Sequence, residues 1–327
     1  MKKISLCSKI ISIVGISILT LFIIALGYYK FQVIGGEIIE VEANPEKGFN
    51  FNYYVYLPYG MKESEVEYLL VETNNAGNVS DDHKVHDKDA YNLIKNGIGH
   101  MIATNLKIPL LVPVFDRPES DWQMYTHALD RDTLMNNKGK LARIDLQLIN
   151  MIGDIKERLK DKNIVVQDKI FMSGFSASGS FVNRFTALHP EIVQAVAAGG
   201  VNCMPIIPAA EWDEQKLIYP IGVYDINQIA GIEFNIDKYK KVSQYIYMGS
   251  LDDNDTLPYD DAFDSDEREL IINFLGTDMH ERWEKSKNIY QQLDVPATMV
   301  MYDDVGHETN DVIIQDIVNF FRAQSAE

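Results

Sequence analysis

Ser176 is the residue whose surroundings point most directly to chemistry. It lies in the segment KIFMSGFSASGS (169–180), where an apolar run that favours a strand gives way to a helical pattern. Gly174 and Ser178 flank it as second neighbours, and a sharp turn from strand to helix needs small residues at both places. Such a turn lifts the serine hydroxyl clear of the sheet, and the backbone N–H of Ala177 then faces the place where an oxyanion would develop. The pattern predicts a serine nucleophile at the start of a helix.

The same segment resembles the nucleophile elbow, G-x-S-x-G, of the α/β-hydrolase family. Ser178 stands where the family most often has glycine, and a small residue can replace glycine there. A second register, SASGS, would make Ser178 the nucleophile, but that register has no glycine corresponding to Gly174. Ser176 is therefore the favoured nucleophile, with Ser178 as the alternative.

The resemblance implies an acid and a histidine, each just past the end of a later strand. The run YIYMGSLD ends at Asp252, and the run MVMYDDVGH ends at His307. By this resemblance His307 takes the proton of Ser176 as attack begins and returns it to the leaving group, while Asp252 holds the imidazole ring. Asp253 and Asp255 lie in the same turn as Asp252, and Asp255 is the alternative acid.

The family's second oxyanion donor comes from the loop after the third strand. Here the run 68–73 leads into the sequence NNAG, and the backbone N–H of Asn75 is the candidate donor beside that of Ala177. The alternative is that Asn74 and Asn75 only form a turn, as asparagine often does.

Two further groups of polar residues could have either a structural or a functional role. Tyr125 and His127 follow an expected strand and are candidates for contacting substrate, but the commoner role is a buried ion-pair and hydrogen-bond cluster. His83 and His86 have the spacing of a metal-binding pair, yet the surrounding sequence DDHKVHD reads as a hydrophilic loop without a complete ligand set. We therefore expect no metal at these histidines, and the family resemblance implies an enzyme that needs neither metal nor cofactor.

The elements that must position these residues follow from the hydrophobic pattern. Short β runs open the domain and suit antiparallel pairing, at 37–41, 51–57 and 67–73. Apolar strands then alternate with amphipathic helices, which predicts parallel strands with helices on both faces. The expected strands are 108–115, 169–173, 193–198, 244–248 and 297–302, and the expected helices are 140–160, 178–188, 266–274, 281–293 and 310–323. This order predicts an α/β fold with a doubly wound, mostly parallel sheet, as in the α/β-hydrolase fold.

One domain is expected over residues 31–327, because no linker divides them. Two stretches do not follow the alternation of strand and helix. Residues 201–239 are mixed polar and aromatic, and we expect them to form a small cap-like insertion over the mouth of the sheet. Residues 76–101 are expected to be a long connection.

Residues 1–30 are expected to form a membrane anchor or a signal peptide. Lysines precede the stretch 10–29, which contains no charged residue, and a helix of that length spans the roughly 30 Å hydrocarbon core of a bilayer. The basic flank should stay in the cytoplasm, so the catalytic domain would lie outside it as part of a single-pass membrane protein. Cleavage near Ala25 would instead give a secreted protein.

The composition excludes several classes of protein. Of 327 residues, 46% are hydrophobic and 24% charged, which is ordinary for a chain with a folded core and argues against disorder. The net charge is −18 and no basic stripe offsets it, so a nucleic-acid partner is not expected. Contact with a membrane is expected only through the N-terminal helix.

The family resemblance extends over roughly residues 67–323. It implies a serine hydrolase that cleaves a small-molecule or polymeric carboxylic ester through an acyl-enzyme, similar to exported bacterial esterases that include relatives of polyhydroxybutyrate depolymerases. Two alternatives remain open: an exported serine peptidase of the same fold, and a hydrolase-like domain that binds a ligand without turnover.

Overall fold

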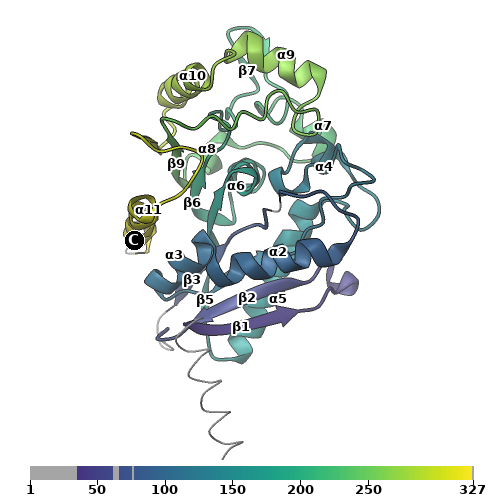
Figure 1. The fold of residues 1–327 in the computed structure, drawn as a ribbon, viewed down its shortest axis with the longest axis vertical. Coiled ribbons are helices and arrows are strands. Elements are labelled where there is room, and N and C mark those ends of the chain that lie inside the picture. The colour runs from purple at the N-terminus through teal and green to yellow at the C-terminus, as the bar shows by residue number, and fades with distance from the viewer. Residues whose placement is uncertain (1–34, 62–65, 76, 326–327) are drawn as a thin grey trace, which may run out of the picture.

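The computed structural model describes residues 35–61, 66–75 and 77–325. An eight-stranded sheet runs through the described part of the chain, in the order β1-β2-β4-β3-β5-β6-β9-β10 (Figure 1). Its strands are β1 (Gly36–Val41), β2 (Tyr53–Pro58), β3 (Glu67–Val71), β4 (Leu110–Pro113), β5 (Val166–Phe175), β6 (Val193–Gly199), β9 (Ser243–Gly249) and β10 (Ala297–Tyr302). Each of the eight strands expected from the sequence is present.

The sheet is antiparallel at one edge and parallel over the rest. β2 pairs antiparallel with both β1 and β4, as expected for the opening strands. β3 differs from that expectation, because it pairs parallel with β4 and β5. The parallel pairing continues from β5 through β6 and β9 to β10. A sheet that is parallel over five neighbouring pairs needs helical crossovers, and these provide the doubly wound arrangement.

Helices cover both faces of the sheet (Figure 1). Side chains of α5, α6, α9 and α10 join one buried apolar cluster, and side chains of α2, α3 and α11 join the other. Strand β5 serves both clusters by alternation, because Ile170 and Met172 face the first and Phe171 faces the second. The helices are α2 (His83–Asn96), α3 (Ile98–Leu106), α4 (Arg131–Met135), α5 (Ile144–Asp161), α6 (Ala177–Leu188), α9 (Ser265–Phe274), α10 (Met279–Gln292) and α11 (Asp311–Gln324).

The prediction of a long connection over residues 76–101 was wrong, because α2 and the start of α3 lie there. Asp82 caps α2 by accepting a hydrogen bond from the N–H of Lys84. The buried face of α2 carries only His86, Ala90 and Ile94, one every four residues. Polar residues surround this narrow stripe, so the hydrophobic pattern in the sequence was weak.

Residues 201–239 contain two short strands and two short helices: β7 (Glu211–Trp212), β8 (Gln215–Lys216), α7 (Ile226–Ala230) and α8 (Ile236–Tyr239). Their side chains are not a separate layer. Ile207, Leu217 and Tyr219 are buried in the same apolar cluster as α5 and α6. The segment therefore belongs to the body of the domain and lies at the upper end of the molecule in the view of Figure 1.

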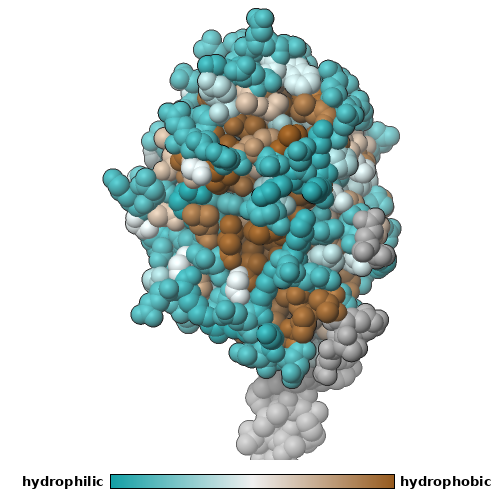
Figure 2. Space-filling view, turned by 180° about the vertical axis from the view of Figure 1, so that it is seen from behind, coloured by the Kyte–Doolittle hydropathy of each residue, from teal (hydrophilic) through white to brown (hydrophobic). Residues whose placement is uncertain are grey.

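The predicted N-terminal membrane or signal helix, residues 1–30, lies outside the described residues. Within the described part of the chain, every helix is too short or too polar to cross a bilayer. On the face opposite to Figure 1, most surface residues are hydrophilic, and hydrophobic residues gather in a band near the middle and in a patch toward the lower end (Figure 2).

The parallel strands bring several loops to one edge of the sheet. The carboxyl ends of β3, β5, β9 and β10 all point to this edge, because the strands run in the same direction. In open α/β sheets ligands bind outside the carboxyl ends of the strands. The loops that follow these four strands carry Asn75, Ser176, Asp252 and His307.

Candidate active site

Ser176 is the single residue between the end of β5 and the start of α6. Its backbone is strained, with φ at 62° and ψ at −127°, a combination that side-chain-bearing residues rarely adopt. The N–H of Ser176 donates to the carbonyl of Gly199 at 2.9 Å, which holds the turn against β6. A Cβ on Gly174 would come within 2.4 Å of the Ser178 carbonyl oxygen. The turn is therefore as tight as the sequence pattern required, and it needs glycine at position 174.

Ser178 lies on the inner side of the same helix. Only 2% of it is exposed, and its hydroxyl is 3.0 Å from that of Thr73. Ser176, in contrast, is partly exposed and lines a cavity. Of the two serines considered from the sequence, only Ser176 is accessible to a substrate in this structure.

His307 and Asp252 are in direct contact. Nδ1 of His307 lies 2.9 Å from one carboxylate oxygen of Asp252 and 3.0 Å from the other. The loops that carry them are joined by a backbone hydrogen bond of 2.8 Å from Leu251 to Val305. Asp252 is buried, whereas His307 is partly exposed. A buried carboxylate on Nδ1 orients the ring and leaves Nε2 as the nitrogen that can accept a proton.

The alternative acids point elsewhere. A carboxylate oxygen of Asp255 lies 2.7 Å from the guanidinium of Arg282, which is fully buried. Asp253 is exposed on the loop surface. The structure thus brings Asp252, and neither of its two neighbours, to the histidine.

Ser176 and His307 are connected through their immediate neighbours. The ring of Phe175, the residue before Ser176, packs on the ring of His307 with centroids 4.7 Å apart. Gly199, which accepts the Ser176 N–H, is followed by Gly200, and a Cβ on Gly200 would lie 3.0 Å from Cε1 of His307. The contacts with Phe175 and Gly200 both place the imidazole of His307 against the turn that carries Ser176.

Asn254 occupies the other side of the imidazole. Its side-chain nitrogen lies 3.1 Å from Nε2 of His307. If Nδ1 donates its proton to Asp252, Nε2 has a free lone pair, and the amide of Asn254 donates to it. No sequence signal pointed to this residue, because asparagine in an acidic loop is ordinary.

The two candidate oxyanion donors, Ala177 and Asn75, belong to segments that both contact the Ser176 turn. Ala177 is the first residue of α6, so its N–H has no acceptor within the helix. The side chain of Asn75 donates to the carbonyl of Phe175 at 3.0 Å, which ties the loop after β3 to the turn. Asn74 is buried and forms two hydrogen bonds with the backbone of Phe115, so it anchors the same loop from behind.

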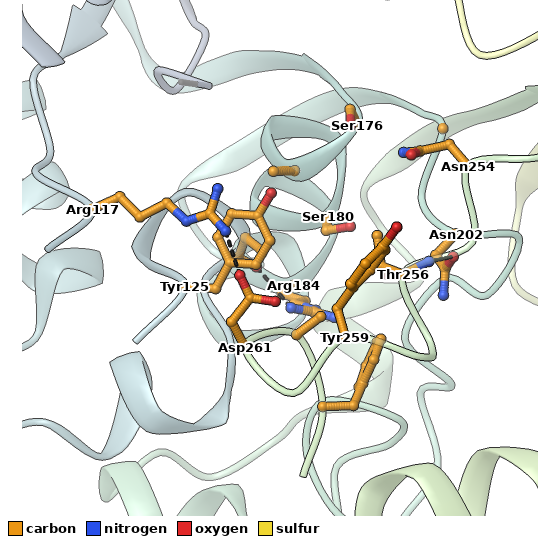
Figure 3. Close-up of a pocket in the computed structure, with 15 residues that line it drawn as sticks. Arg117, Tyr125, Ser176, Ser180, Arg184, Asn202, Asn254, Thr256, Tyr259 and Asp261 are labelled. Atoms are coloured by element: carbon orange, nitrogen blue, oxygen red, sulfur yellow. Dashed lines mark hydrogen bonds and ion pairs between the residues drawn. The ribbon is translucent and has the colours of Figure 1, made fainter. Parts of the chain in front are cut away.

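A cavity of about 300 Å³ opens beside Ser176 (Figure 3). Most of its wall comes from α6 and from the loop after β9. The lining residues include Ser176 at the turn, Ser180 and Arg184 on α6, Asn254, Thr256, Tyr259 and Asp261 on the loop, and Arg117 and Tyr125 from the segment after β4. Residues 201–239 contribute Asn202 to this lining. Residues 254–263 therefore contribute more of this lining than residues 201–239 do.

Tyr125 lies at the cavity surface, whereas His127 lies in the protein interior. Tyr125 lines the cavity, with its ring 3.7 Å from the guanidinium carbon of Arg117. His127 is fully buried, and its Nε2 lies 2.8 Å from the carbonyl of Phe115 and 3.0 Å from the amide of Asn74. His127 belongs to the buried cluster that was the alternative to substrate contact, and it supports the loop that carries Asn75.

His83 and His86 lie in α2 and not in the hydrophilic loop expected from the sequence. Nδ1 of His83 is 2.5 Å from Asp116, whereas Nε2 of His86 is 2.9 Å from the carbonyl of Ser80. Among the residues that the structure describes, no group of three or more histidine, cysteine or acidic side chains is arranged to hold a metal ion.

Comparisons with known proteins find similarity in structure but not in sequence. No model of a known protein family matches the chain, and no curated protein matches it. Among solved structures, poly(aspartic acid) hydrolase-1 from Sphingomonas sp. KT-1 is similar with a TM-score of 0.54 and 15% identity, over 89% of this chain and 97% of that one.

Two further structures are similar at the same level. LpqC, a poly(3-hydroxybutyrate) depolymerase from Bordetella parapertussis, has a TM-score of 0.53 and 14% identity over 89% of this chain and 91% of its own. An S-formylglutathione hydrolase from Agrobacterium tumefaciens has a TM-score of 0.51 and 12% identity over 90% of this chain and 96% of its own. With the sheet order, the crossovers and the strained turn at Ser176, these similarities establish that the chain has the α/β-hydrolase fold.

Proposed function

We propose that this protein is a serine hydrolase that cleaves carboxylic esters with Ser176, His307 and Asp252 as its catalytic triad. The contact between Nδ1 of His307 and the buried carboxylate of Asp252, beside a strained serine turn, is the observation that carries the proposal. In the proposed reaction Ser176 is the nucleophile, His307 the base and Asp252 the acid that orients the base. A domain that only binds a ligand has no physical need for this set.

The reaction would proceed in two halves. Oγ of Ser176 attacks the ester carbonyl carbon, and its proton passes to Nε2 of His307. The C–O bond of the resulting tetrahedral species breaks, and the alcohol leaves with that proton. Water then attacks the acyl-enzyme, His307 again takes a proton, and the acid is released as Ser176 regains its own. Asp252 keeps the imidazole oriented and stabilises its cation throughout.

The negative charge of the tetrahedral species would be held by the backbone N–H groups of Ala177 and Asn75. Ala177 stands at the positive end of the α6 dipole. The side-chain bond from Asn75 to the Phe175 carbonyl keeps the second loop within reach of the serine. Preorganised donors of this kind are among the largest contributions to catalysis of acyl transfer.

The structural neighbours support hydrolysis. Three proteins with this fold are named as a poly(aspartic acid) hydrolase, a poly(3-hydroxybutyrate) depolymerase and an S-formylglutathione hydrolase. The names describe different substrates, so they support hydrolase chemistry in general. The preference for an ester over an amide is part of the proposal and needs its own substrate panel.

The test is labelling of domain 31–327 by a fluorophosphonate probe, which reacts quickly only with an activated serine. We expect wild type and Ser178→Ala to be labelled and Ser176→Ala to remain unlabelled. Short alkyl esters and a peptide panel then separate esterase from peptidase activity. Absence of labelling in correctly folded wild type, or labelling that persists in Ser176→Ala, would overturn the proposed triad.

The proposal includes export of this domain. The uncharged stretch 10–29, preceded by lysines, supports insertion with residues 31–327 outside the cytoplasm. Protease added to intact cells that express the whole chain should degrade the domain or find it already released into the medium. Full protection in intact cells, with degradation after lysis, would contradict export.

A further inference from the structure

The cavity beside Ser176 is lined by more positive than negative charge. Its charged lining residues are Arg117, Arg184 and Asp261, two cations and one anion. The chain as a whole carries a net charge of −18, so the net positive charge of the cavity lining is opposite in sign to the net charge of the protein. Desolvated charge inside a cavity acts on a ligand far more strongly than charge on the open surface.

Arg117 is held in place on two sides. Its Nη2 lies 2.5 Å from a carboxylate oxygen of Asp261, and its guanidinium packs on the ring of Tyr125. Only 6% of Arg117 is exposed. Its Nε is buried without a hydrogen-bond partner among the described residues. The ion pair with Asp261 therefore satisfies only part of this guanidinium.

Arg184 is the second cation, and no carboxylate in the described part of the chain lies within ion-pair distance of it. Only 8% of Arg184 is exposed, and its Nη1 donates to the carbonyl of Ala128 at 2.9 Å. Two acids are buried nearby. Burial raises the pKa of Glu267 to about 8, so it is mostly neutral at pH 7. Burial also raises the pKa of Asp130 to about 6, and its carboxylate accepts the N–H of Thr133.

The position of Arg184 relative to the serine follows from the helix. Ser176, Ser180 and Arg184 are four residues apart, so they line one side of the cavity in successive turns (Figure 3). Four residues rise about 6 Å along a helix, so the Cα of Arg184 lies about 12 Å from that of Ser176. Long side chains on a helix lean toward its N-terminus, which brings the guanidinium back toward the serine.

We propose that the cavity selects esters that carry a carboxylate in addition to the ester group, with Arg184 as the principal recognition residue and Arg117 assisting it. This inference rests on the proposed ester hydrolysis at Ser176. A carboxylate can form charge-assisted hydrogen bonds with a guanidinium, and a site built with such a cation discriminates against a ligand that leaves it unpaired. The carboxylate can belong to either the acyl or the alcohol part of the ester.

Two matched pairs of esters test the selection and distinguish its source. Monoethyl glutarate and ethyl pentanoate differ only by a carboxylate in place of the terminal methyl of the acyl chain. The same exchange in the alcohol part relates 4-acetoxybutanoate to butyl acetate. Titration of released acid at constant pH gives kcat/KM for each. We expect the anionic member of one pair to be preferred by about tenfold or more, as a charged hydrogen bond suggests.

Two sets of variants separate charge from folding. Arg184→Gln should lose the preference by lowering kcat/KM for the anionic ester much more than for the neutral ester, and Arg184→Lys should retain part of the preference. Ser180→Asp and Ser180→Asn have side chains of nearly equal size, but only the first adds a carboxylate next to Arg184. We expect Ser180→Asp alone to lose the preference. Arg322→Gln on α11 serves as a control away from the cavity.

Binding to Ser176→Ala provides a measurement that needs no turnover. By calorimetry, monoethyl glutarate should bind this variant at least tenfold more tightly than ethyl pentanoate does, and Arg184→Gln in the same background should abolish the difference. Equal kcat/KM within both ester pairs, together with equal binding of monoethyl glutarate and ethyl pentanoate, would overturn the inference and leave the esterase proposal intact. Absence of any esterase activity or probe labelling would overturn the proposed function itself.

Discussion

The side-chain nitrogen of Asn254 lies 3.1 Å from Nε2 of His307, on the opposite side of the ring from Asp252. Nε2 is the atom that must take the proton of Ser176 in the proposed reaction. The amide therefore holds the histidine in the tautomer that a general base needs, and at the same time it occupies the lone pair that the serine hydroxyl must reach. Attack by Ser176 requires this hydrogen bond to be released.

We expect Asn254→Ala to increase the rate of fluorophosphonate labelling by about two- to tenfold. A neutral hydrogen bond contributes about 0.5–1.5 kcal/mol, and in the variant that free energy no longer opposes access to Nε2. Single-turnover labelling followed by gel fluorescence measures the rate. Asp253→Asn changes an exposed neighbour in the same loop and should leave the rate unchanged. Slower labelling of Asn254→Ala would mean that the amide assists the base.

Asp252 and Asp255 should give opposite results when each is changed to asparagine. Asp252→Asn should lower kcat by about 10³- to 10⁴-fold with little loss of stability, because the His307 ring loses the carboxylate that orients it. Asp255→Asn should keep kcat within about threefold, but it should lower the free energy of unfolding by about 2 kcal/mol or more. The charge of buried Arg282 then loses its partner. Ester kinetics and urea unfolding of both variants check the pair.

The strands and the nucleophile turn could be predicted from the sequence because each leaves a local signal. The runs around Ile170 and Ile246 are apolar on both faces of the sheet, and a serine between small residues after such a run is typical of a nucleophile turn. Asp252 and His307 followed from the family resemblance, which locates them at strand ends. Asp252 could not be separated from Asp255 on the sequence, since both are acids in one loop and only the contacts with His307 and Arg282 distinguish them.

The structural features that could not be predicted from the sequence depend on contacts between segments that are distant in the chain. Helix α2 has a buried stripe of only three residues, so its hydrophobic periodicity was too weak to predict it. The cavity wall at 254–263 is an acidic loop without regular structure, and its position over Ser176 is a property of the fold. Arg117 and Arg184 are far apart in the chain, so no local pattern indicated that both would line one cavity.

Gly174, near the end of strand β5, should tolerate no side chain, in contrast to Gly153 in helix α5. We expect Gly174→Ala to lower the free energy of unfolding by about 2–4 kcal/mol and to abolish probe labelling, because its Cβ would lie 2.4 Å from the Ser178 carbonyl. Gly153 in α5 is exposed, and a Cβ added there would meet nothing within 4 Å. Gly153→Ala should therefore stabilise the protein by about 0.5–1 kcal/mol and leave labelling unchanged. Urea unfolding with parallel labelling measures both effects, and equal behaviour of the two variants would contradict the strained turn.

Glu72, at the end of β3, should make stability depend on pH. It is almost completely buried, and one carboxyl oxygen accepts the N–H of Gly99 at 2.8 Å. Burial raises the pKa of Glu72 to about 8, from an ordinary value of 4.5. Between these two values the folded protein binds more protons than the unfolded chain does, so the free energy of unfolding falls as pH rises.

Replacing Glu72 by glutamine removes this titration and keeps an oxygen that can accept the Gly99 N–H. The free energy of unfolding of wild type should fall from pH 5 to pH 8, and that of Glu72→Gln should not fall for this reason. The difference between the variant and wild type should therefore increase by on the order of 3 kcal/mol over this range. Glu267 also has its pKa raised to about 8, but it is present in both proteins, so its contribution cancels in the difference. Urea unfolding at pH 5, 6.5 and 8 gives the comparison, and Glu42→Gln, at an exposed position, should match wild type at all three. If the difference between the free energies of unfolding of Glu72→Gln and wild type stays constant with pH, Glu72 is already ionised in the folded protein. Only a carboxyl group that is protonated in the folded state makes that state lose stability as the group loses its proton.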